Sequence, residues 1–517
     1  MRAISLLAFP LLLTACPFLV DEVPGEGEGE GEGEGEPGEG EGEGEGEGEG
    51  EGEGEGEGEG EGEGEGEGEG EGEGEGEGEG EGEGEGEGEG EGEGEAVDVG
   101  DLIARLRADP AGATDEISRE LGWPVRTADG FFFVSLREDR AFFAGDTNSF
   151  APEAMTIERN GGTFLFAFIE RDAGDGQRYK FVSQQAGGTF EADPSSRSYA
   201  FDSNGEMSFT SRIGIPRNEY PLQYERHFNL DLPNDNELVA RNVRILVPSS
   251  TPTRVLYVHD GQNVFARDSS IPDGFGIPFG GWGLDESAPD DTMIVAIDNT
   301  FDRFFDYTHV QDSIGDGPTG GGADLYADFI QFVVRPLVDD VYGEPAIVGT
   351  MGSSLGGLVA FAIADRYPDD FDFAAGMSST FGWGSFPNGA NDGDDTMIDA
   401  YDGAGVRHTV LYLDSGGDAG AGCADEDGDG INDDDGEADD NFCETEQMRD
   451  LLDGQGYLLD TLELPPDGQS LSINPAADLF YVYDAGPSGT GDAQHNEEAW
   501  RFRSAAFVFP LFSSLVE

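Results

Sequence analysis

One serine lies where a strand is expected to turn sharply into a helix. Residues 346–348 are apolar and predict a short buried strand, and apolar residues at helical spacing over 355–367 predict a helix. Between them, residues 352–356 read Gly-Ser-Ser-Leu-Gly and fit the pattern Gly-x-Ser-x-Gly. In this context the central serine, Ser354, projects above the sheet as a nucleophile. The backbone N–H of Leu355 then faces the oxyanion that forms during attack.

A serine nucleophile needs a base, because an alcohol near neutral pH attacks poorly until another group takes its proton. His495 is the best candidate among the five histidines. It follows an apolar strand predicted at 479–483 and a Gly-rich loop, and a helix is predicted to begin at Asn496. Because it lies after Ser354 in the chain, it fits the order nucleophile, acid, histidine.

The elements that must position these residues alternate between strand and helix. Strands are predicted at 254–258, 293–297, 346–348, 373–376 and 409–413, and helices at 323–341, 355–367 and 446–454. This alternation is typical of a mainly parallel sheet with helices on both faces. With the serine turn after a central strand, the predicted fold class is α/β, of the α/β-hydrolase type.

Upstream, residues 101–121 predict one or two short helices, and from Gly130 the hydrophobic period changes to two. Short strands at this spacing predict a small β-sandwich. The expected organisation is a sequence of five parts: signal peptide 1–15, tether 16–97, helical lead-in 98–129, β-sandwich 130–213 and α/β-hydrolase domain 214–517 with an insertion at 419–443.

Several segments resemble the esterase family that includes enterochelin esterases, esterase D and bacterial feruloyl esterases. The matching segments, in order, are residues 258–265 (VHDGQNVF), Trp282 with Asp285, residues 297–303 (IDNTFDR), the Ser354 turn and residues 494–500 (QHNEEAW). The resemblance implies serine ester hydrolysis by Ser354 and His495. It also places a second oxyanion donor at Gly261 or Gln262.

The acid of the triad is less clear from the sequence. The family places it three residues beyond a glycine that follows the strand at 409–413, which here falls on Ala419. Asp418, one position away, is the first candidate and Asp414 the second. Asp440 or Glu444 could also return from the insertion. The role of the acid is to orient the imidazole and stabilise its protonated form.

The predicted sandwich resembles the early-set module, relatives of which bind glycogen and starch and which precedes the hydrolase in enterochelin-esterase-like proteins. The resemblance rests on residues 140–150 and 178–182 with 193–197. Phe150 stands where the family usually has a tryptophan, the usual stacking platform for sugars. The prediction therefore favours a packing module beside the active site over carbohydrate binding.

The N-terminus predicts export. Residues 2–15 form a basic start and an apolar stretch too short to span a bilayer as a mature helix. Residues 13–16 (Leu-Thr-Ala-Cys) resemble the lipobox of bacterial lipoproteins, which implies cleavage before Cys16 and its lipidation. Pro17 favours the outer membrane, on its periplasmic or cell-surface side. The alternative is an ordinary secretory signal with a chance cysteine.

The chain carries a net charge of −86 over 517 residues. Residues 26–95 alternate Glu and Gly, which predicts an extended, disordered tether because no apolar side chain is available to bury. This tether holds 35 glutamates, so about −51 remains on the rest of the chain. Such acidity excludes nucleic acid as an expected partner.

The other two cysteines flank the insertion. With Cys16 assigned to lipid, Cys423 and Cys443 remain to form a disulfide in an oxidising compartment. Between them the sequence matches a calcium loop of the D-x-D-x-D-G type. Its expected ligands are Asp425, Asp427, Asp429, the Ile431 carbonyl and Asp433. Position 12 is Gly436 and not the usual Glu, so an acidic loop without calcium is the alternative, and no cofactor is expected for catalysis.

The main hypothesis is a lipid-anchored serine esterase that acts through an acyl-enzyme. Its substrates would be small-molecule or polysaccharide-linked esters, such as feruloyl or acetyl esters, or ester siderophores. Acyl transfer on the same fold is a second enzymatic hypothesis. A non-catalytic adhesion or binding lipoprotein is the third, and the irregular position of the acid is its best support.

Overall fold

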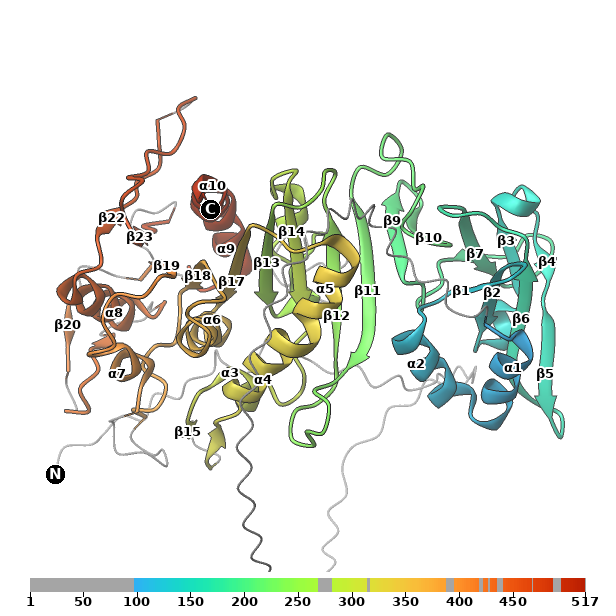
Figure 1. Cartoon of the computed structure of the whole chain (residues 1–517), viewed down its shortest axis with the longest axis horizontal. Coiled ribbons are helices and arrows are strands. Elements are labelled where there is room, and N and C mark those ends of the chain that lie inside the picture. Colours follow the sequence, from blue (N-terminus) through green and yellow to red (C-terminus); the bar gives the residue numbers. More distant parts are fainter. Residues whose placement is uncertain are drawn as a thin grey trace, which may run out of the picture. The chain divides into compact units, whose positions relative to one another are not determined.

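The computed structural model describes residues 97–267, 281–313, 317–386, 395–417, 422–425, 428–434, 440–466, 468–486 and 494–516. The chain divides into two units, Met1–Gly88 and Glu89–Glu517, and all of these residues lie in the second (Figure 1). The predicted signal peptide, Cys16 and the tether up to residue 96 are outside the described residues. Of the helices in the described ranges, none is long and apolar enough to cross a bilayer.

A long sheet organises the second unit. Its C-terminal section has, in spatial order, β11 (Gln223–Leu230), β12 (Arg241–Val247), β14 (Thr292–Ile297), β13 (Arg254–His259), β17 (Ile347–Ser353), β18 (Phe373–Met377), β19 (Val410–Ser415), β23 (Leu479–Tyr483) and β22 (Leu459–Thr461). From β14 to β22 all neighbours are parallel. Strands β11 and β12 are antiparallel to their neighbours.

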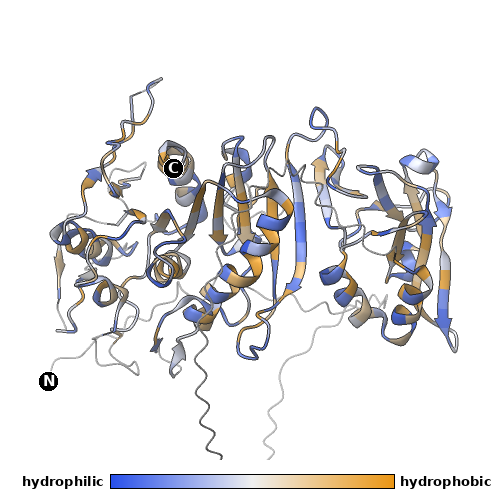
Figure 2. Ribbon diagram, in the orientation of Figure 1, coloured by the Kyte–Doolittle hydropathy of each residue, from blue (hydrophilic) through white to orange (hydrophobic). Residues whose placement is uncertain are grey.

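Alternate residues of these strands face two separate cores. In β13, Val255 and Tyr257 pack into one core, while Leu256 and Val258 pack into the other. The same alternation holds in β14, β19 and β23. Because both faces are buried, the strands are apolar almost throughout, as Figure 2 shows for the central strands.

Helices cover the two faces. The face with Val255 packs against α3 (Arg303–Tyr307), α4 (Ala323–Phe329), α5 (Arg335–Tyr342), α6 (Leu355–Arg366), α7 (Met397–Tyr401) and α8 (Phe442–Gln455). The opposite face packs against α9 (Glu497–Arg503) and α10 (Phe509–Ser514). The helix predicted at 323–341 is found as α4 and α5, joined by a π-helical segment at Ile330–Val334.

The N-terminal strands form a second sheet and also extend the first. The second sheet has the order β1 (Val125–Thr127), β2 (Gly130–Ser135), β6 (Thr163–Arg171) and β5 (Thr156–Asn160). The extension beyond β11 consists of β9 (Ser198–Asp202), β10 (Gly205–Phe209), β7 (Arg178–Val182), β3 (Phe142–Gly145) and β4 (Glu153–Ala154), with β8 (Phe190–Glu191) beside β7. Strand β9 pairs with β11 through Tyr199 and Tyr224, so the sheet is continuous across residue 214.

The packing of strand β2 on both of its faces explains why residues 131–134 are all apolar and do not alternate with polar residues. Phe133 packs against Phe143 of β3 and Tyr179 of β7, with ring centroids 4.8 Å apart in both pairs. Phe132, its neighbour, lies in a cluster with residues of α1 (Val99–Ala108) and α2 (Pro110–Glu120). The strand is therefore buried on both faces, by helices on one side and by strands on the other.

The remaining elements are short. They are the pairs β15 (Gln311–Asp312) with β16 (Thr319–Gly320) and β20 (Cys423–Ala424) with β21 (Asp433–Asp434), the 3-10 turns η1 (Glu138–Arg140), η2 (Asp146–Asn148), η3 (Gly261–Asn263) and η4 (Leu284–Glu286), and the π-helical segment η6 (Ser504–Val508) between α9 and α10. The predicted α/β class with helices on both faces is confirmed for the C-terminal section. The sheet as a whole is mixed, because β11, β12 and the N-terminal strands are antiparallel. The β-sandwich remains a prediction.

Candidate active site

The predicted nucleophile and base follow strands that run in the same direction. Ser354 comes directly after β17, and His495 follows β23. A third residue, Asp440, lies between β19 and α8. Because β17, β18, β19 and β23 are parallel neighbours, their carboxyl ends meet at one edge of the sheet, which is where α/β sheets place ligand sites.

Ser354 has the backbone of a strained turn. Strand β17 ends at Ser353 and α6 begins at Leu355, so a single residue turns the chain. Ser354 has φ 55° and ψ −126°, outside the regions that L-residues ordinarily adopt. Its N–H donates to the carbonyl of Met377 (2.9 Å). The residue is buried, with 7% of its surface exposed. The sharp turn predicted from the pentapeptide is present.

The glycines of the pentapeptide leave room for this turn. A Cβ on Gly352 would overlap the backbone of Gly356. A Cβ on Gly356 would lie 3.3 Å from Asp260 Oδ2, which is tighter than most real contacts, and 3.5 Å from His259 Cβ, which is an ordinary contact. The strand and the helix can therefore approach each other closely because Gly352 lacks a side chain, whereas Gly356 faces the end of β13.

His495 is paired with Asp440. The His495 Nδ1 atom lies 3.0 Å from Asp440 Oδ1, and the aspartate is almost fully buried whereas the imidazole is 35% exposed. Asp440 and Asn441 both have positive φ, 38° and 54°, and direct the chain into α8. The Asn441 side chain donates to the Ser378 carbonyl (2.8 Å), which fixes this turn against the end of β18.

This pairing differs from the order of preference in the sequence. The first candidate for the acid, Asp418, lies outside the described residues. The second, Asp414, points to the buried guanidinium of Arg503 and accepts a hydrogen bond from Tyr412 (2.8 Å). Glu444, in the first turn of α8, accepts from the N–H of Gly382. Of the carboxylates named from the sequence that lie in the described ranges, Asp440 is the one that contacts His495.

Asp440 is suited to remain ionised. Burial raises the pKa of Asp440, but the hydrogen bond with His495 and the charge of Arg503 outweigh burial, so this pKa lies below its usual value. The N–H of Gly416 also donates to Asp440 Oδ2. Asp414 behaves differently: burial raises the pKa of Asp414 to about 6, although Arg503 opposes the shift.

The loop after β18 connects the serine turn with the histidine. Ser378 Oγ accepts hydrogen bonds from Trp500 Nε1 (3.1 Å) and from Arg503 Nη1 (3.1 Å). The Trp500 ring in turn packs edge-on against the His495 ring, with centroids 5.1 Å apart. On the other side, the carbonyl of Met377 accepts from the N–H of Ser354. The two candidate catalytic residues are thus fixed to one short segment.

The predicted oxyanion donors lie at the ends of β13 and β17. Leu355 is the first residue of α6, and the first N–H groups of a helix have no acceptor within it. Gly261 opens η3, and a Cβ there would meet the backbone of Ala296 and Ile297. The Gln262 side chain is fixed, because its Oε1 accepts from the N–H of Asn299 (3.0 Å). Strands β13 and β17 are adjacent, so the two loops begin at the same sheet edge.

His259, at the end of β13, is a structural residue of this region. Its Nδ1 lies 2.9 Å from Tyr326 Oη and its Nε2 lies 2.9 Å from Thr350 Oγ1. Burial lowers the pKa of His259 to about 3, so the ring is neutral. The next residue, Asp260, is paired with Arg303 through two hydrogen bonds of 2.8 Å. Both groups are therefore engaged in packing the loop and not in proton transfer.

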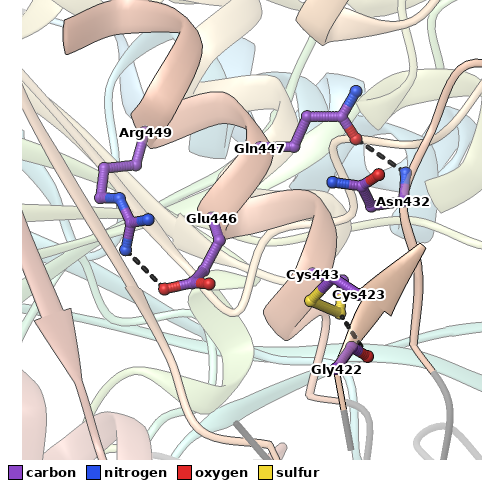
Figure 3. The surroundings of a disulfide bond; sticks show 7 residues. All are labelled: Gly422, Cys423, Asn432, Cys443, Glu446, Gln447 and Arg449. Carbon is purple, nitrogen blue, oxygen red and sulfur yellow. Dashed lines mark hydrogen bonds and ion pairs between the residues drawn. A yellow bond between two sulfur atoms is a disulfide. The ribbon is translucent and has the colours of Figure 1, made fainter. Parts of the chain in front are cut away.

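A disulfide closes the insertion beside Asp440. Cys423 and Cys443, the pair expected from the sequence, are bonded, with Cα atoms 5.4 Å apart. Cys443 is the second residue of α8, three positions after Asp440. Figure 3 shows the bond next to Gln447, whose Oε1 accepts from the Asn432 N–H (2.7 Å) and whose Nε2 donates to the Gly430 carbonyl (2.8 Å). The insertion is thereby attached to α8 at two points.

The predicted calcium ligands are described in part. Asp425 accepts from the N–H groups of Gly428 (2.6 Å) and Gly430 (3.2 Å), and Asp429 accepts from the Ile431 N–H (2.9 Å). Asp427 and the side chain of Asp433 are outside the described residues. Among the side chains that the structure describes, no group of three or more His, Cys, Asp or Glu is arranged to hold a metal ion.

The serine turn after the fifth strand of a mainly parallel sheet, with helices on both faces, defines an α/β-hydrolase-type domain. Residues 224–446 match the model of the family described as Putative esterase. This part of the chain is therefore an esterase-family domain, as the resemblance in the sequence predicted. The match ends before His495 and includes both Ser354 and Asp440.

Solved structures similar to this chain include the following three proteins. An enterobactin esterase from Shigella flexneri has 14% identity and a TM-score of 0.34, with 74% of this chain and 92% of that chain covered. MPT51 from Mycobacterium tuberculosis has 15% identity and a TM-score of 0.34, with 57% and 99% covered. The siderophore hydrolase EstB from Aspergillus nidulans has 17% identity and a TM-score of 0.30, with 62% and 96% covered. No curated protein matches the chain at a significant level.

Proposed function

We propose that this protein is a serine esterase that uses Ser354 as nucleophile, His495 as general base and Asp440 as the acid of the triad. The observation that carries the proposal is the 3.0 Å contact between His495 Nδ1 and Asp440 Oδ1, in an esterase-family domain whose Ser354 has the strained backbone of a nucleophile turn. Each residue follows a different strand, but all three lie at one sheet edge.

The reaction has two stages. His495 uses the ring nitrogen that faces away from Asp440, Nε2, to take the proton of Ser354 Oγ as this oxygen attacks the ester carbonyl. The same nitrogen then gives the proton to the leaving alcohol, and an acyl-enzyme remains on Ser354. In the second stage water attacks the acyl group in the same way. The buried carboxylate of Asp440 keeps a proton on Nδ1 and stabilises the imidazolium that forms in both stages.

The oxyanion is stabilised by backbone N–H groups. Leu355 supplies one from the start of α6, and the segment Gly261–Gln262 supplies the other from the start of η3. Because the carbonyl oxygen gains charge only during attack, these donors act mainly on the transition state.

A vestigial, non-catalytic site is disfavoured by the same geometry. Its best support in the sequence was the missing acid at the family position, Ala419. With Asp440 against His495, that argument no longer applies.

The test of esterase activity is turnover of p-nitrophenyl acyl esters and of a feruloyl ester, with glycerol added to reveal transfer to an alcohol in place of water.

The N-terminal strands are proposed to form an early-set β-sandwich that packs beside the esterase domain. The pairing of β9 with β11 supports the packing role, because it joins the two parts through one sheet. Phe150 lies under the guanidinium of Arg178, 5.6 Å from the ring centroid, which leaves one of its faces engaged within the protein. Binding of sugars is not part of this proposal.

We also propose that Cys16 carries the lipid anchor, on the basis of the lipobox-like residues 13–16. Cys16→Ser should release the protein from the membrane fraction, because no diacylglyceryl group can attach without the thiol and stable anchoring needs more than one acyl chain. Fractionation with and without detergent measures the effect. A variant that still needs detergent for extraction would show that the anchor is elsewhere.

Calcium is proposed as a structural ligand of the insertion, supported by the spacing of Asp425, Asp427 and Asp429. A cation that binds only the folded loop stabilises by mass action, about 2.7 kcal/mol at a concentration of 100 Kd. Calcium should therefore raise Tm, and Asp425→Asn should remove this increase, whereas Asp453→Asn on the exposed part of α8 should not. A Tm that is the same in EDTA and in millimolar calcium would mean that the loop is acidic without being a site.

A further inference from the structure

Arg503 is the last residue of α9 and is completely buried. Its guanidinium contacts five residues, four of which are far from Arg503 in the sequence or follow a different strand. Its contacts are Asp440 Oδ2 (Nη2, 3.3 Å), the Gln494 carbonyl (Nη2, 2.8 Å), Ser378 Oγ (Nη1, 3.1 Å), Asp484 Oδ2 (Nε, 3.2 Å) and Asp414 Oδ1 (Nη1). The planar fork of an arginine is required to serve so many acceptors at once.

Two of these contacts involve the proposed catalytic pair: one is with the acid and the other is with the residue before the base. Asp440 uses Oδ1 for His495 and Oδ2 for Arg503 and for the N–H of Gly416, so both of its oxygens are engaged. The Gln494 carbonyl, one residue before His495, accepts from the same Nη2 that faces Asp440. One nitrogen of Arg503 thus fixes the acid and the backbone next to the base.

We propose that Arg503 is a positioning residue that aligns Asp440 with His495 for catalysis. The inference rests on the proposed esterase function and adds a residue to it that no sequence motif indicated. Arg503 acts through Asp440 and does not touch the substrate. The competing account is that Arg503 only balances the negative charge of the buried carboxylates.

The charges around Arg503 make the two accounts separable. The groups that face it are Asp414 and Tyr412 from β19, Asp440 from the turn before α8 and Asp484 from the end of β23, with His495 beyond Asp440. Removing Arg503 alone leaves three buried or partly buried carboxylates without their cation. Replacing Arg503 by Met and Asp414 by Asn removes one positive and one negative charge, so the net charge of the group stays that of the wild type. The Oδ2 atom of Asp440 still loses the guanidinium.

The experiment compares the full-length protein with Arg503→Lys, Arg503→Met and the double variant Arg503→Met/Asp414→Asn. Arg501→Met is the matched control, because Arg501 lies on the same helix and pairs with Glu286 at the surface. The readouts are kcat and KM for a p-nitrophenyl ester, together with Tm. The cooperative thermal transition of each variant gives its folded fraction, and kcat is expressed per folded protein.

We expect kcat to fall about 10²-fold in the double variant while KM changes little and Tm stays near the wild-type value, since a small misplacement of a catalytic group costs about this much. Arg503→Lys should retain the fold and lose about 10-fold in kcat, because an ammonium group lacks the fork that reaches Asp440 and the Gln494 carbonyl together.

Wild-type kcat in either folded variant would overturn the inference and leave charge balance as the role of Arg503. Failure of the double variant to fold does not remove the test, because Arg503→Lys keeps the cation in place. If the wild-type protein hydrolyses no ester and takes no fluorophosphonate label, the proposed function fails, which is a different result from a normal Arg503 variant of an active enzyme.

Discussion

Ser354→Ala should lower kcat for a p-nitrophenyl ester by about 10⁶-fold, which is the loss seen when the nucleophile of a serine hydrolase is removed. The reason is the register of the turn. Ser354 alone has the strained backbone, φ 55° and ψ −126°, that lifts its hydroxyl from the end of β17. The measurement is steady-state turnover at a substrate concentration above KM.

Ser353→Ala is the matched control for this prediction. Ser353 is the last residue of β17, pairs in register with Met377 of β18 and is 3% exposed. Its side chain belongs to the sheet and not to the turn, so its loss should leave kcat within a few-fold of wild type. If Ser353→Ala removed activity and Ser354→Ala did not, the register of the turn would have been assigned incorrectly.

Asp440→Asn should lower kcat by about 10⁴-fold, because the amide no longer keeps the proton on Nδ1 and the imidazole takes the wrong tautomer. Substrate binding should change little, since Asp440 lies behind the imidazole and is almost fully buried. Asp450→Asn, the same substitution on an exposed residue of α8, is the control. Turnover by each purified variant against one ester measures the effect.

Asp414→Asn tests the second candidate that the sequence offered for the acid. Asp414 is buried against Arg503, so its replacement should reduce stability, by an amount below the roughly 3–5 kcal/mol of a fully broken buried pair because Asp440 and Asp484 still face the cation. Its effect on kcat should be much smaller than that of Asp440→Asn. A severe kcat loss in folded Asp414→Asn beside a normal Asp440→Asn would transfer the role of the acid to Asp414.

The local parts of this site could be predicted from the sequence because their signals are local. The turn at Ser354 is encoded within about twenty residues: an apolar strand, two glycines, of which Gly352 has no room for a side chain, and an apolar helix. His495 could be placed from its order after Ser354 and from the strand that precedes it. The same holds for the α/β class, which follows from alternating apolar segments.

Asp440 could not be selected in the same way, because its position depends on the path of the insertion. It lies 25 residues after the end of β19 and reaches His495 only because the chain returns to the sheet edge at α8. The signal that was available is the cysteine three residues later: Cys423 follows β19 closely, and a bond from it to Cys443 returns Asp440 to the same region.

The join between the N-terminal strands and the esterase domain was also beyond sequence reasoning. The period of two from Gly130 onward predicted short strands without indicating which partner each strand would have. The pairing of Tyr199 with Tyr224 makes one sheet of two predicted domains. Such pairings depend on contacts between the sheets as a whole, which periodicity within one segment does not report.

The most direct test of the account is to find which residue a fluorophosphonate modifies. The probe reacts with a serine only when a neighbouring base activates it, so it reports the nucleophile and the base together. Peptide mass spectrometry of the labelled wild-type protein should find the adduct on Ser354, and Asp440→Asn should label far more slowly. An adduct on another serine, or no adduct on a protein that hydrolyses esters, would contradict the account.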